Sequence, residues 1–554
     1  MACTTANIAE SLLAKGADSA AAVLHRDRLI TYGELRREVL QIAGQLLADG
    51  HVKGDRVALC VENSPFFVAA YLGTIRAGLV SVPIQTEATA ERFKAIMTNT
   101  GARSVFVSER LQGRVRPWAQ ELGAILLTEN YARGSPAAAA PSFPEAEPTR
   151  DLAALMFTSG STGSPKGVMV THRNIECNTR DIIQYLGLVP DDRVMVVLPF
   201  HYCFGLSLMH THLMAGASLV LNNDFRLFPE TMLLEMRRRE CTGLAGVPST
   251  YQILLRRSRF RELAFPHLRW LQQAGGRLPS PCIREIQAAF PGVRFFAMYG
   301  QTEATARLSY LPPERLADRL GSIGKGLPST ELAVLHSDGT PIQPGSDELG
   351  EVVAAGDNIT PGYWNDSTET AAFFRNGKLH TGDIARVDSD GFIYLVDRAR
   401  DMIKSGGHRV SAQEVEDVLA ELPGVLEVAV VGAPHEELGE ASYAFVVPTP
   451  GACLTAREVK AHCRKRLPAF MVPEEVAFLK DLVHNSAGKV LKQELRRLAL
   501  VHSALVMPSS FGLRHSSFSL GPRVLPRGPT VPARTQAAPS PPRAKPFPSR
   551  RKPV

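Results

Sequence analysis

Short apolar runs alternate with longer amphipathic stretches along most of the chain. The runs have the composition of buried strands, and the stretches between them have the spacing of helices with one exposed face. The clearest runs are at 152–158, 194–200, 270–275 and 293–298, and clear helical patterns are at 230–240 and 281–290. Such alternation predicts an α/β fold with mainly parallel strands, which binds ligands at the carboxyl ends of those strands.

The pattern changes from about residue 330, where the strands become shorter and turns more frequent. A helix is expected at 414–422, a strand at 426–432 and a second helix at 455–467. We therefore predict a second, smaller α+β domain that starts near residue 400.

The net charge of +7 is concentrated at one end of the chain. Residues 501–554 hold nine basic residues, no Asp or Glu and eleven of the 39 prolines, which leaves 53 basic and 55 acidic residues in 1–500. The charge of the folded part therefore gives no support for nucleic-acid binding. The tail has the composition of a disordered segment, and it can be an arm for an acidic partner, an inert extension or a coding artefact.

Several features indicate a cytoplasmic protein without a membrane span. The eight cysteines form no CxxC pair, which argues against a zinc site and against a secreted disulfide framework. The N-terminus lacks the pattern of an export signal. The longest apolar stretch, 66–84, is interrupted by Arg76 and Pro83 and is too short to span a bilayer as a helix.

The strand at 152–158 leads directly into a segment of glycines, hydroxyl groups and one lysine. Glycines let successive NH groups converge, and the hydroxyls and the lysine add donors and positive charge, so we predict a phosphate-binding loop. It differs from the common nucleotide loop GxxxxGK[ST], because Pro165 and Gly167 stand at two of the required positions. The residues after it, 168–175, are expected to be helical.

The segment FTSGSTGSPKGVMVTHRNI resembles the phosphate-loop motif of the adenylate-forming (AMP-binding) superfamily, which includes acyl-CoA synthetases, adenylation domains of peptide synthetases and beetle luciferases. Further motifs follow the family's order, among them YGQTEA at 299, HTGD at 380 and NSAGKVLKQEL at 485. The resemblance implies an N-terminal AMP-binding domain over 1–398 and a small mobile C-terminal domain over 399–500, with 501–554 as the disordered tail.

The resemblance also implies a reaction. A carboxylic acid attacks the α-phosphorus of ATP, pyrophosphate leaves, and the acyl adenylate then passes its acyl group to the thiol of coenzyme A. Because the attack brings two anions together, the enzyme must supply positive charge and alignment. By resemblance, the β- and γ-phosphates are held by Thr158, Ser159, Gly160, Ser161, Thr162, Gly163 and Lys166.

The YGQTEA motif implies contacts to the rest of the nucleotide. Thr302 would meet the α-phosphate, and Glu303 would carry Mg²⁺, which is usually held on nucleotides by few carboxylates together with phosphate oxygens and waters. Tyr299 would stack on adenine. Gly275 and Gly276 would let the base lie close to the backbone.

Three further residues match the family's nucleotide and catalytic positions. Asp383 would accept hydrogen bonds from both ribose hydroxyls, and Arg398 would be the second ribose or phosphate contact. Lys489 would bridge the attacking carboxylate and the α-phosphate. Its motif lacks the proline usually found just before it and has His484 and Asn485 instead.

A hinge is implied at Arg400, where relatives carry Asp or Lys. Rotation of the C-terminal domain about this residue would withdraw Lys489 after adenylation. The rotation would present to the incoming thiol the residues Lys404, Ser405, Gly406 and Gly407.

The acyl pocket is implied by the motif LPFHYCFG at 198. Amino-acid-activating relatives have an Asp where His201 stands, so the sequence favours an acid without an amino group. The candidate pocket residues are His201, Tyr202, Phe204, Gly205, Val247 and Pro248. They predict a fatty or other apolar or aromatic acid, although His201 can equally be a packed core histidine.

Coenzyme A is the expected acceptor, because the chain has no carrier-protein segment with a serine attachment motif. The phosphopantetheine arm of a separate carrier protein is the alternative acceptor. A nucleotide-binding regulatory protein without catalysis is a third possibility, and the presence of Lys489, Glu303 and Asp383 argues against it.

Overall fold

The computed structural model describes residues 7–131, 142–159, 165–398, 401–435, 437–485 and 488–506. Residues 1–505 belong to one compact unit. Residues 501–506 of the predicted tail are helical, as the end of a helix over Lys492–Val506, so the tail does not start at 501; the prediction for 507–554 lies outside the described residues. Within the described part, no helix is long and apolar enough to cross a membrane.

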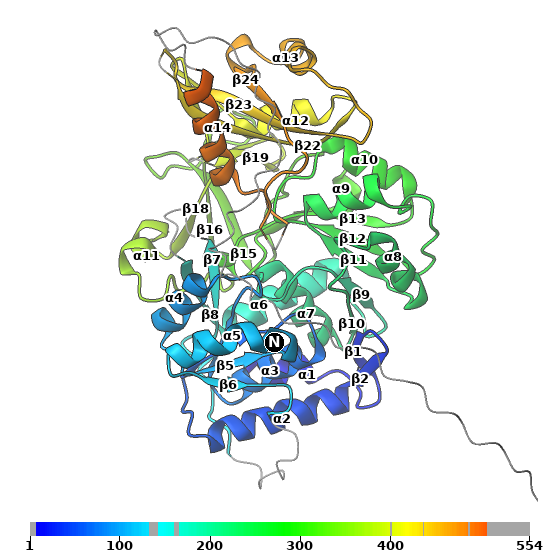
Figure 1. Cartoon of the computed structure of the whole chain (residues 1–554), viewed down its shortest axis with the longest axis vertical. Helices are drawn as coiled ribbons and strands as arrows, with labels where there is room; N and C mark the ends of the chain where they lie inside the picture. Colours follow the sequence, from blue (N-terminus) through cyan, green and yellow to red (C-terminus); the bar gives the residue numbers. More distant parts are fainter. Residues whose placement is uncertain are drawn as a thin grey trace, which may run out of the picture. The chain divides into compact units, whose positions relative to one another are not determined.

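Two mainly parallel sheets form the centre of the N-terminal region (Figure 1). In the eight-stranded sheet, only the edge strands β14 and β2 pair antiparallel to their neighbours. Its order is β14 (Ser309–Leu311), β13 (Arg294–Tyr299), β12 (Trp270–Gln273), β11 (Gly243–Gly246), β9 (Arg193–Val196), β10 (Ser218–Leu221), β1 (Ala21–His25) and β2 (Arg28–Thr31). The six-stranded sheet is β6 (Ile125–Leu127), β5 (Ser104–Val107), β3 (Arg56–Cys60), β4 (Val80–Pro83), β7 (Leu152–Ser159) and β8 (Pro165–Thr171).

Helices cover both faces of each of these sheets. The core between the two sheets is filled from α1 (Ile8–Leu13), α2 (Tyr32–Ala48), α3 (Pro65–Arg76), α6 (His172–Leu186) and α7 (Cys203–Ala215). The outer face of the eight-stranded sheet is covered by α8 (Pro229–Arg238), α9 (Pro248–Arg257) and α10 (Ser280–Ala289). The outer face of the six-stranded sheet is covered by α4 (Ala90–Thr100) and α5 (Glu109–Glu121). The predicted α/β architecture is therefore confirmed.

An antiparallel sheet follows, which explains the change of pattern near residue 330. Its strands are β15 (Thr330–Leu335), β16 (Gly350–Gly356), β18 (Lys378–Val387), β17 (Phe374–Arg375) and β19 (Ile393–Arg398), with α11 (Ser367–Phe373) between β16 and β17 in the chain.

The last sheet starts at residue 403 and has helices on both faces. It comprises β21 (His408–Val410), β20 (Ile403–Ser405), β23 (Gly439–Pro448), β22 (Val425–His435) and β24 (Glu475–Phe478). One face packs on α12 (Ala412–Ala420) and α13 (Ala456–Arg464), the other on α14 (Lys492–Val506). A small C-terminal α+β domain is thus present, while its exact boundary at 398/399 stays a prediction.

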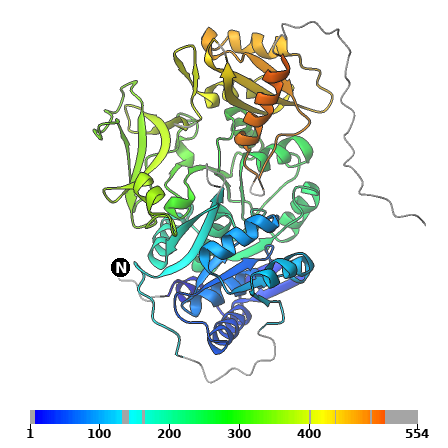
Figure 2. The same cartoon turned by 60° about the vertical axis from the view of Figure 1, so that its left-hand side comes forward.

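The prediction of a helix at 168–175 is wrong for residues 168–171. Residues up to Thr171 form β8, which pairs antiparallel with β7 in a long hairpin, drawn in cyan in Figure 2. β-branched residues at 168, 170 and 171 favour a strand here. Helix α6 begins at His172, after a capping box in which Thr171 and Asn174 satisfy each other's backbone NH groups.

The start of α7 depends on Gly205. A Cβ atom at this position would lie 2.3 Å from the carbonyl oxygen of Pro199, which is backbone and cannot move aside cheaply. The close approach fixes the direction in which the segment with His201 and Tyr202 enters α7. Gly205 therefore has a packing role in addition to its place among the candidate pocket residues.

Gly205→Ala is expected to destabilise the protein by about 1–3 kcal/mol, because the methyl group overpacks the turn before α7. The matched control is Gly113→Ala, in the middle of α5, where a Cβ would meet nothing within 4 Å. That change should be neutral or stabilise by up to about 1 kcal/mol. Urea unfolding measures both, and equal effects would contradict the packing role.

Candidate active site

The carboxyl ends of three neighbouring parallel strands bring several predicted site residues together. Strands β11, β12 and β13 lie side by side and end at Gly246, Gln273 and Tyr299. The residues that follow them are Val247, Gly275 and the YGQTEA loop. This is the edge at which α/β sheets bind ligands.

One hydrogen-bonded group at this edge comprises the buried residues Tyr299 and Asp383 together with Arg398. The Tyr299 hydroxyl donates to Asp383 Oδ2 at 2.5 Å, and Arg398 Nε lies 3.1 Å from Asp383 Oδ1. Burial, and then the Asp383 charge, raise the pKa of Tyr299 well above its usual value, so the phenol stays protonated and donates. The predicted adenine and ribose residues thus meet at one point, although they come from different sheets.

The YGQTEA loop contacts two other motifs. Thr302 Oγ1 donates to Cys203 Sγ at 3.4 Å, which ties the loop to the start of α7. Glu303 Oε1 accepts a 2.7 Å hydrogen bond from the hydroxyl of Tyr363. The backbone carbonyl of Glu303 also accepts from the NH and the hydroxyl of Thr360, each at 3.0 Å.

Lys166 lies close to the same tyrosine. Its Nζ pairs with Glu369 and stands 5.8 Å from the ring centroid of Tyr363. The phosphate-loop lysine and Glu303 are therefore both within reach of Tyr363.

Glu303 fits a magnesium ion that is held mainly by a nucleotide. The described residues contain no group of three or more His, Cys, Asp or Glu side chains that could hold a metal. Mg²⁺ on nucleotides commonly uses one or two carboxylates and fills its shell with phosphate oxygens and waters. One carboxylate with a fixed orientation meets that need, and an all-protein metal site is not formed here.

The two glycines after β12 allow close packing at the nucleotide edge. Gly275 has φ +84°, and a Cβ there would lie 2.8 Å from the Tyr202 hydroxyl and 3.0 Å from Val247 Cγ1. A Cβ at Gly276 would lie 3.3 Å from Pro248 Cγ. Five residues predicted for the acyl and adenine sites thus lie against one another.

The segment that carries Lys489 docks at this place. Ser249 Oγ donates to the carbonyl of Gly488 at 3.0 Å, and a Cβ at Gly488 would lie 2.8 Å from Val247 Cγ2. Asn485 organises the turn, because its Oδ1 accepts from the NH of Lys489 at 2.9 Å. Lys489 itself is exposed.

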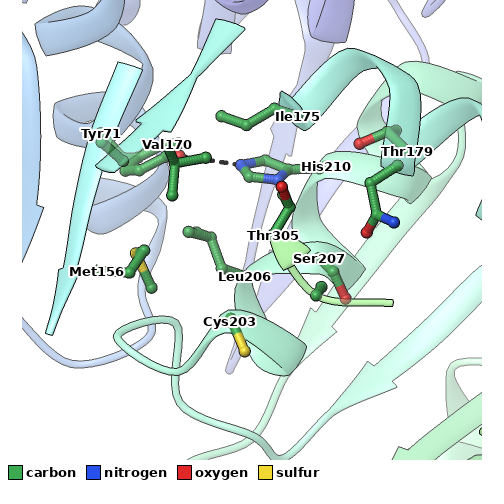
Figure 3. Close-up of a pocket in the computed structure, with 13 residues that line it drawn as sticks. Tyr71, Met156, Val170, Ile175, Thr179, Cys203, Leu206, Ser207, His210 and Thr305 are labelled. Atoms are coloured by element: carbon green, nitrogen blue, oxygen red, sulfur yellow. Dashed lines mark hydrogen bonds between the residues drawn. The ribbon is translucent and has the colours of Figure 1, made fainter. Parts of the chain in front are cut away.

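Behind this edge, α7 borders a cavity of about 10 Å³, which is room for one water molecule (Figure 3). Cys203 lies at one end of the view, and His210 bonded to Tyr71 lies near the other, with a distance of 3.1 Å from Nε2 to the hydroxyl. An acyl group that entered here would have to displace the walls.

Of the remaining predicted pocket residues, Phe204 is buried and His201 is half-buried. Burial lowers the pKa of His201 to about 4, so its imidazole is neutral at pH 7. Phe204 packs under the guanidinium of Arg307, 4.8 Å from the ring centroid.

The residues predicted for thiolation form a tight hairpin in the C-terminal domain. Gly406 and Gly407 have φ values of +55° and +82° and connect β20 to β21, and Lys404 is exposed on β20. Two positive φ angles suit a two-residue hairpin turn, which glycine adopts without strain. The predicted residues Gly160, Ser161, Thr162, Gly163 and Arg400 lie outside the described residues, as does the side chain of Ser159.

Sequence reasoning missed three contacts of this site, made by Tyr363, Glu369 and Ser249. Tyr363 lies in the segment GYWN at 362–365, for which the sequence indicated no role. Its hydroxyl next to Glu303 becomes evident only from the fold, since 60 residues separate the two.

The chain matches two family models, "AMP-binding enzyme" over residues 10–364 and "AMP-binding enzyme C-terminal domain" over residues 414–489. A feruloyl-CoA synthase from Amycolatopsis sp is 34% identical over 86% of this chain and 96% of its own length.

Two solved structures have the same fold. An anthranilate CoA ligase in complex with anthranoyl-AMP has a TM-score of 0.83 and 25% identity, covering 91% of this chain and 99% of its own. The o-succinylbenzoate coenzyme A synthetase from Bacillus subtilis, in complex with ATP and magnesium ion, has a TM-score of 0.78 and 28% identity, covering 88% and 99%. The protein therefore belongs to the AMP-binding enzyme family, as an AMP-forming acid–CoA ligase.

Gly488→Ala is expected to release the turn that carries Lys489, because the added methyl would meet both Val247 and Ser249. Hydrogen exchange at the amides of Asn485, Gly488 and Lys489 should become faster by about tenfold or more. The control, Gly377→Ala, has a similar positive φ of +71° with nothing within 4 Å of a Cβ. Unchanged exchange in Gly488→Ala, relative to that control, would contradict the docking.

Proposed function

We propose that this ligase activates a fatty, aromatic or other apolar carboxylic acid with ATP, releases pyrophosphate, and transfers the acyl group from the adenylate to the thiol of coenzyme A. The observation that supports this most is the approach of the Lys489 turn to Val247 and Ser249, since Val247 also meets Gly275 at the end of β12. A cation is thereby available where nucleotide and acid would meet.

Asp383 and Arg398 bind the ribose in this proposal. Asp383 already accepts from Tyr299 through Oδ2, and its two oxygens have further lone pairs for hydroxyl donors. Arg398 pairs directly with this carboxylate, with its Nε 3.1 Å from Oδ1. Adenine lies against Tyr299 and close to the backbone at Gly275 and Gly276.

Positive charge and orientation drive the first half-reaction. Lys166 and the glycine-rich loop hold the outer phosphates, Thr302 contacts the α-phosphate, and Lys489 holds the carboxylate oxygen against it. Glu303 would hold Mg²⁺, which would supply further positive charge to the phosphates. Tyr363 orients Glu303 by its hydrogen bond, and Glu369 holds Lys166 until phosphate replaces it as the anionic partner.

The second half-reaction requires the Lys489 turn to leave. The C-terminal domain rotates about Arg400, and the hairpin with Lys404, Gly406 and Gly407 takes its place at the thiol. Coenzyme A is the acceptor in this proposal, as the name of the feruloyl-CoA synthase states for that relative. A carrier protein's phosphopantetheine arm is the alternative acceptor.

Carboxylate-dependent exchange of labelled pyrophosphate into ATP tests the first half-reaction. The folded enzyme should show exchange with at least one member of a panel of fatty, aromatic and dicarboxylic acids. Absence of exchange with the whole panel would refute the proposed activity. Addition of coenzyme A or a phosphopantetheinylated carrier protein then identifies the acceptor.

Lys489→Ala should lower the rate of adenylate formation by about a hundredfold or more, since it removes the charge that holds two anions together. Thiolysis of a supplied acyl adenylate should change little, because the lysine has left by then. Lys480→Ala, an exposed lysine on the same domain, is the control and should affect neither step. Equal losses in both steps for Lys489→Ala would contradict the rotation.

A further inference from the structure

Arg307 packs against Phe204 at the start of α7, although no sequence motif indicated a role for it. Its residue is 1% exposed. Its backbone NH donates to Asn178 Oδ1 at 3.2 Å, and its carbonyl accepts from Asn178 Nδ2 at 2.8 Å. Asn178 lines the cavity next to Cys203, together with Thr305 and Ala306.

The guanidinium of Arg307 is held by weak contacts only. It lies over the ring of Phe204, and its Nε donates to the hydroxyl of Tyr185 at 3.3 Å. Its Nη2 is buried without a hydrogen-bond partner. None of the ion pairs among the described residues includes Arg307.

Several charged side chains of low exposure elsewhere in the described residues are paired. Asp383 pairs with Arg398 at 3.1 Å, Asp192 with Arg269 at 2.7 Å, and Glu416 with Lys492 at 2.7 Å. A buried ionised group without a counter-charge is costly, and guanidinium stays ionised in proteins. A buried guanidinium without an ion-pair partner at a ligand site is explained if the bound ligand supplies its counter-ion.

The position of Arg307 agrees with an acyl ligand. Phe204, beneath the guanidinium, directly follows Cys203, and Cys203 contacts the proposed α-phosphate residue Thr302. The positive charge also opposes the effect of burial on the pKa of Tyr202 and of Cys203, so its field reaches the proposed acyl pocket. Arg307 therefore lies beside a residue predicted to contact the acyl group.

We propose that Arg307 is the counter-ion for a second carboxylate, at the far end of the acid, and that the substrate of this ligase is a dicarboxylic acid with an apolar body. The proposal rests on the proposed adenylation. The proposal narrows the expected substrate class of fatty or aromatic acids. The apolar pocket residues contact the apolar body of the acid, and Arg307 recognises its second carboxylate. An amino group remains excluded, since a cation here would repel it.

Pyrophosphate exchange with matched acids tests the proposal. Adipate, suberate and terephthalate are compared with hexanoate, octanoate and p-toluate, which have the same carbon skeletons and one carboxylate. The wild-type enzyme should favour at least one diacid over its partner by about tenfold or more in kcat/KM.

Arg307→Met keeps the length of the side chain and removes the charge. It should lower kcat/KM for the preferred diacid by about thirtyfold or more and leave or raise that for the monoacid, and Arg307→Lys should recover part of the loss. Arg294→Met is the control, because Arg294 also lies over a phenylalanine ring but away from the pocket, and it should not change the ratio.

The outcomes separate the two proposals. Exchange with monoacids at least as fast as with their diacids, or a ratio that Arg307→Met leaves unchanged, overturns the role of Arg307 and leaves adenylation intact. No exchange with any acid overturns the proposed activity and this inference with it. If Arg307→Met does not fold, the wild-type ratios and Arg307→Lys decide the matter.

Discussion

The contact of Gly275 and Gly488 with the same side chain, Val247, is the constraint on which the candidate active site depends. Val247 Cγ1 and Cγ2 would lie 3.0 and 2.8 Å from Cβ atoms at these two glycines. Only residues without a side chain let the nucleotide loop and the lysine turn approach from both sides. The position of Lys489 relative to the end of β12 is therefore set by backbone packing, before any ligand contributes.

Most cationic side chains around this contact pair with a carboxylate. That carboxylate either stays in place or can be replaced by an anion of the ligand. Asp383 pairs with Arg398 in the proposed nucleoside site, whereas Glu369 pairs with Lys166, for which a phosphate can compete. Tyr363 connects Glu303 with Lys166, because its hydroxyl donates to Glu303 and its ring faces Lys166. Arg307 departs from this pattern, which is why we assign its partner to the substrate.

The sequence predicted much of the fold because the apolar runs are short and well separated. The runs at 152–158 and 270–275 correspond to β7 and β12, and the helix expected at 281–290 corresponds to α10. The error at 168–171 has a physical reason. A short apolar run occurs in strands and in buried helix turns alike, and the pairing with β7 decides between them here.

The candidate site was predictable where one motif carries the chemistry and not where the fold assembles it. Tyr299, Asp383 and Arg398 were each expected at the nucleotide, but their mutual hydrogen bonds depend on how β13 and β18 are placed. Ser249 and Arg307 gave no signal, because a serine after a proline and a lone arginine are common on surfaces. Their burial is a property of the tertiary structure alone.

The central claim is that the acid's own oxygen attacks the α-phosphorus of ATP. The most direct test uses an acid labelled with heavy oxygen in its carboxylate, turned over with ATP and coenzyme A. One carboxylate oxygen becomes the bridge to phosphorus and stays there when the thiol displaces AMP, so each AMP should carry one heavy oxygen by mass spectrometry. AMP without the label, or label in the pyrophosphate, would contradict the account.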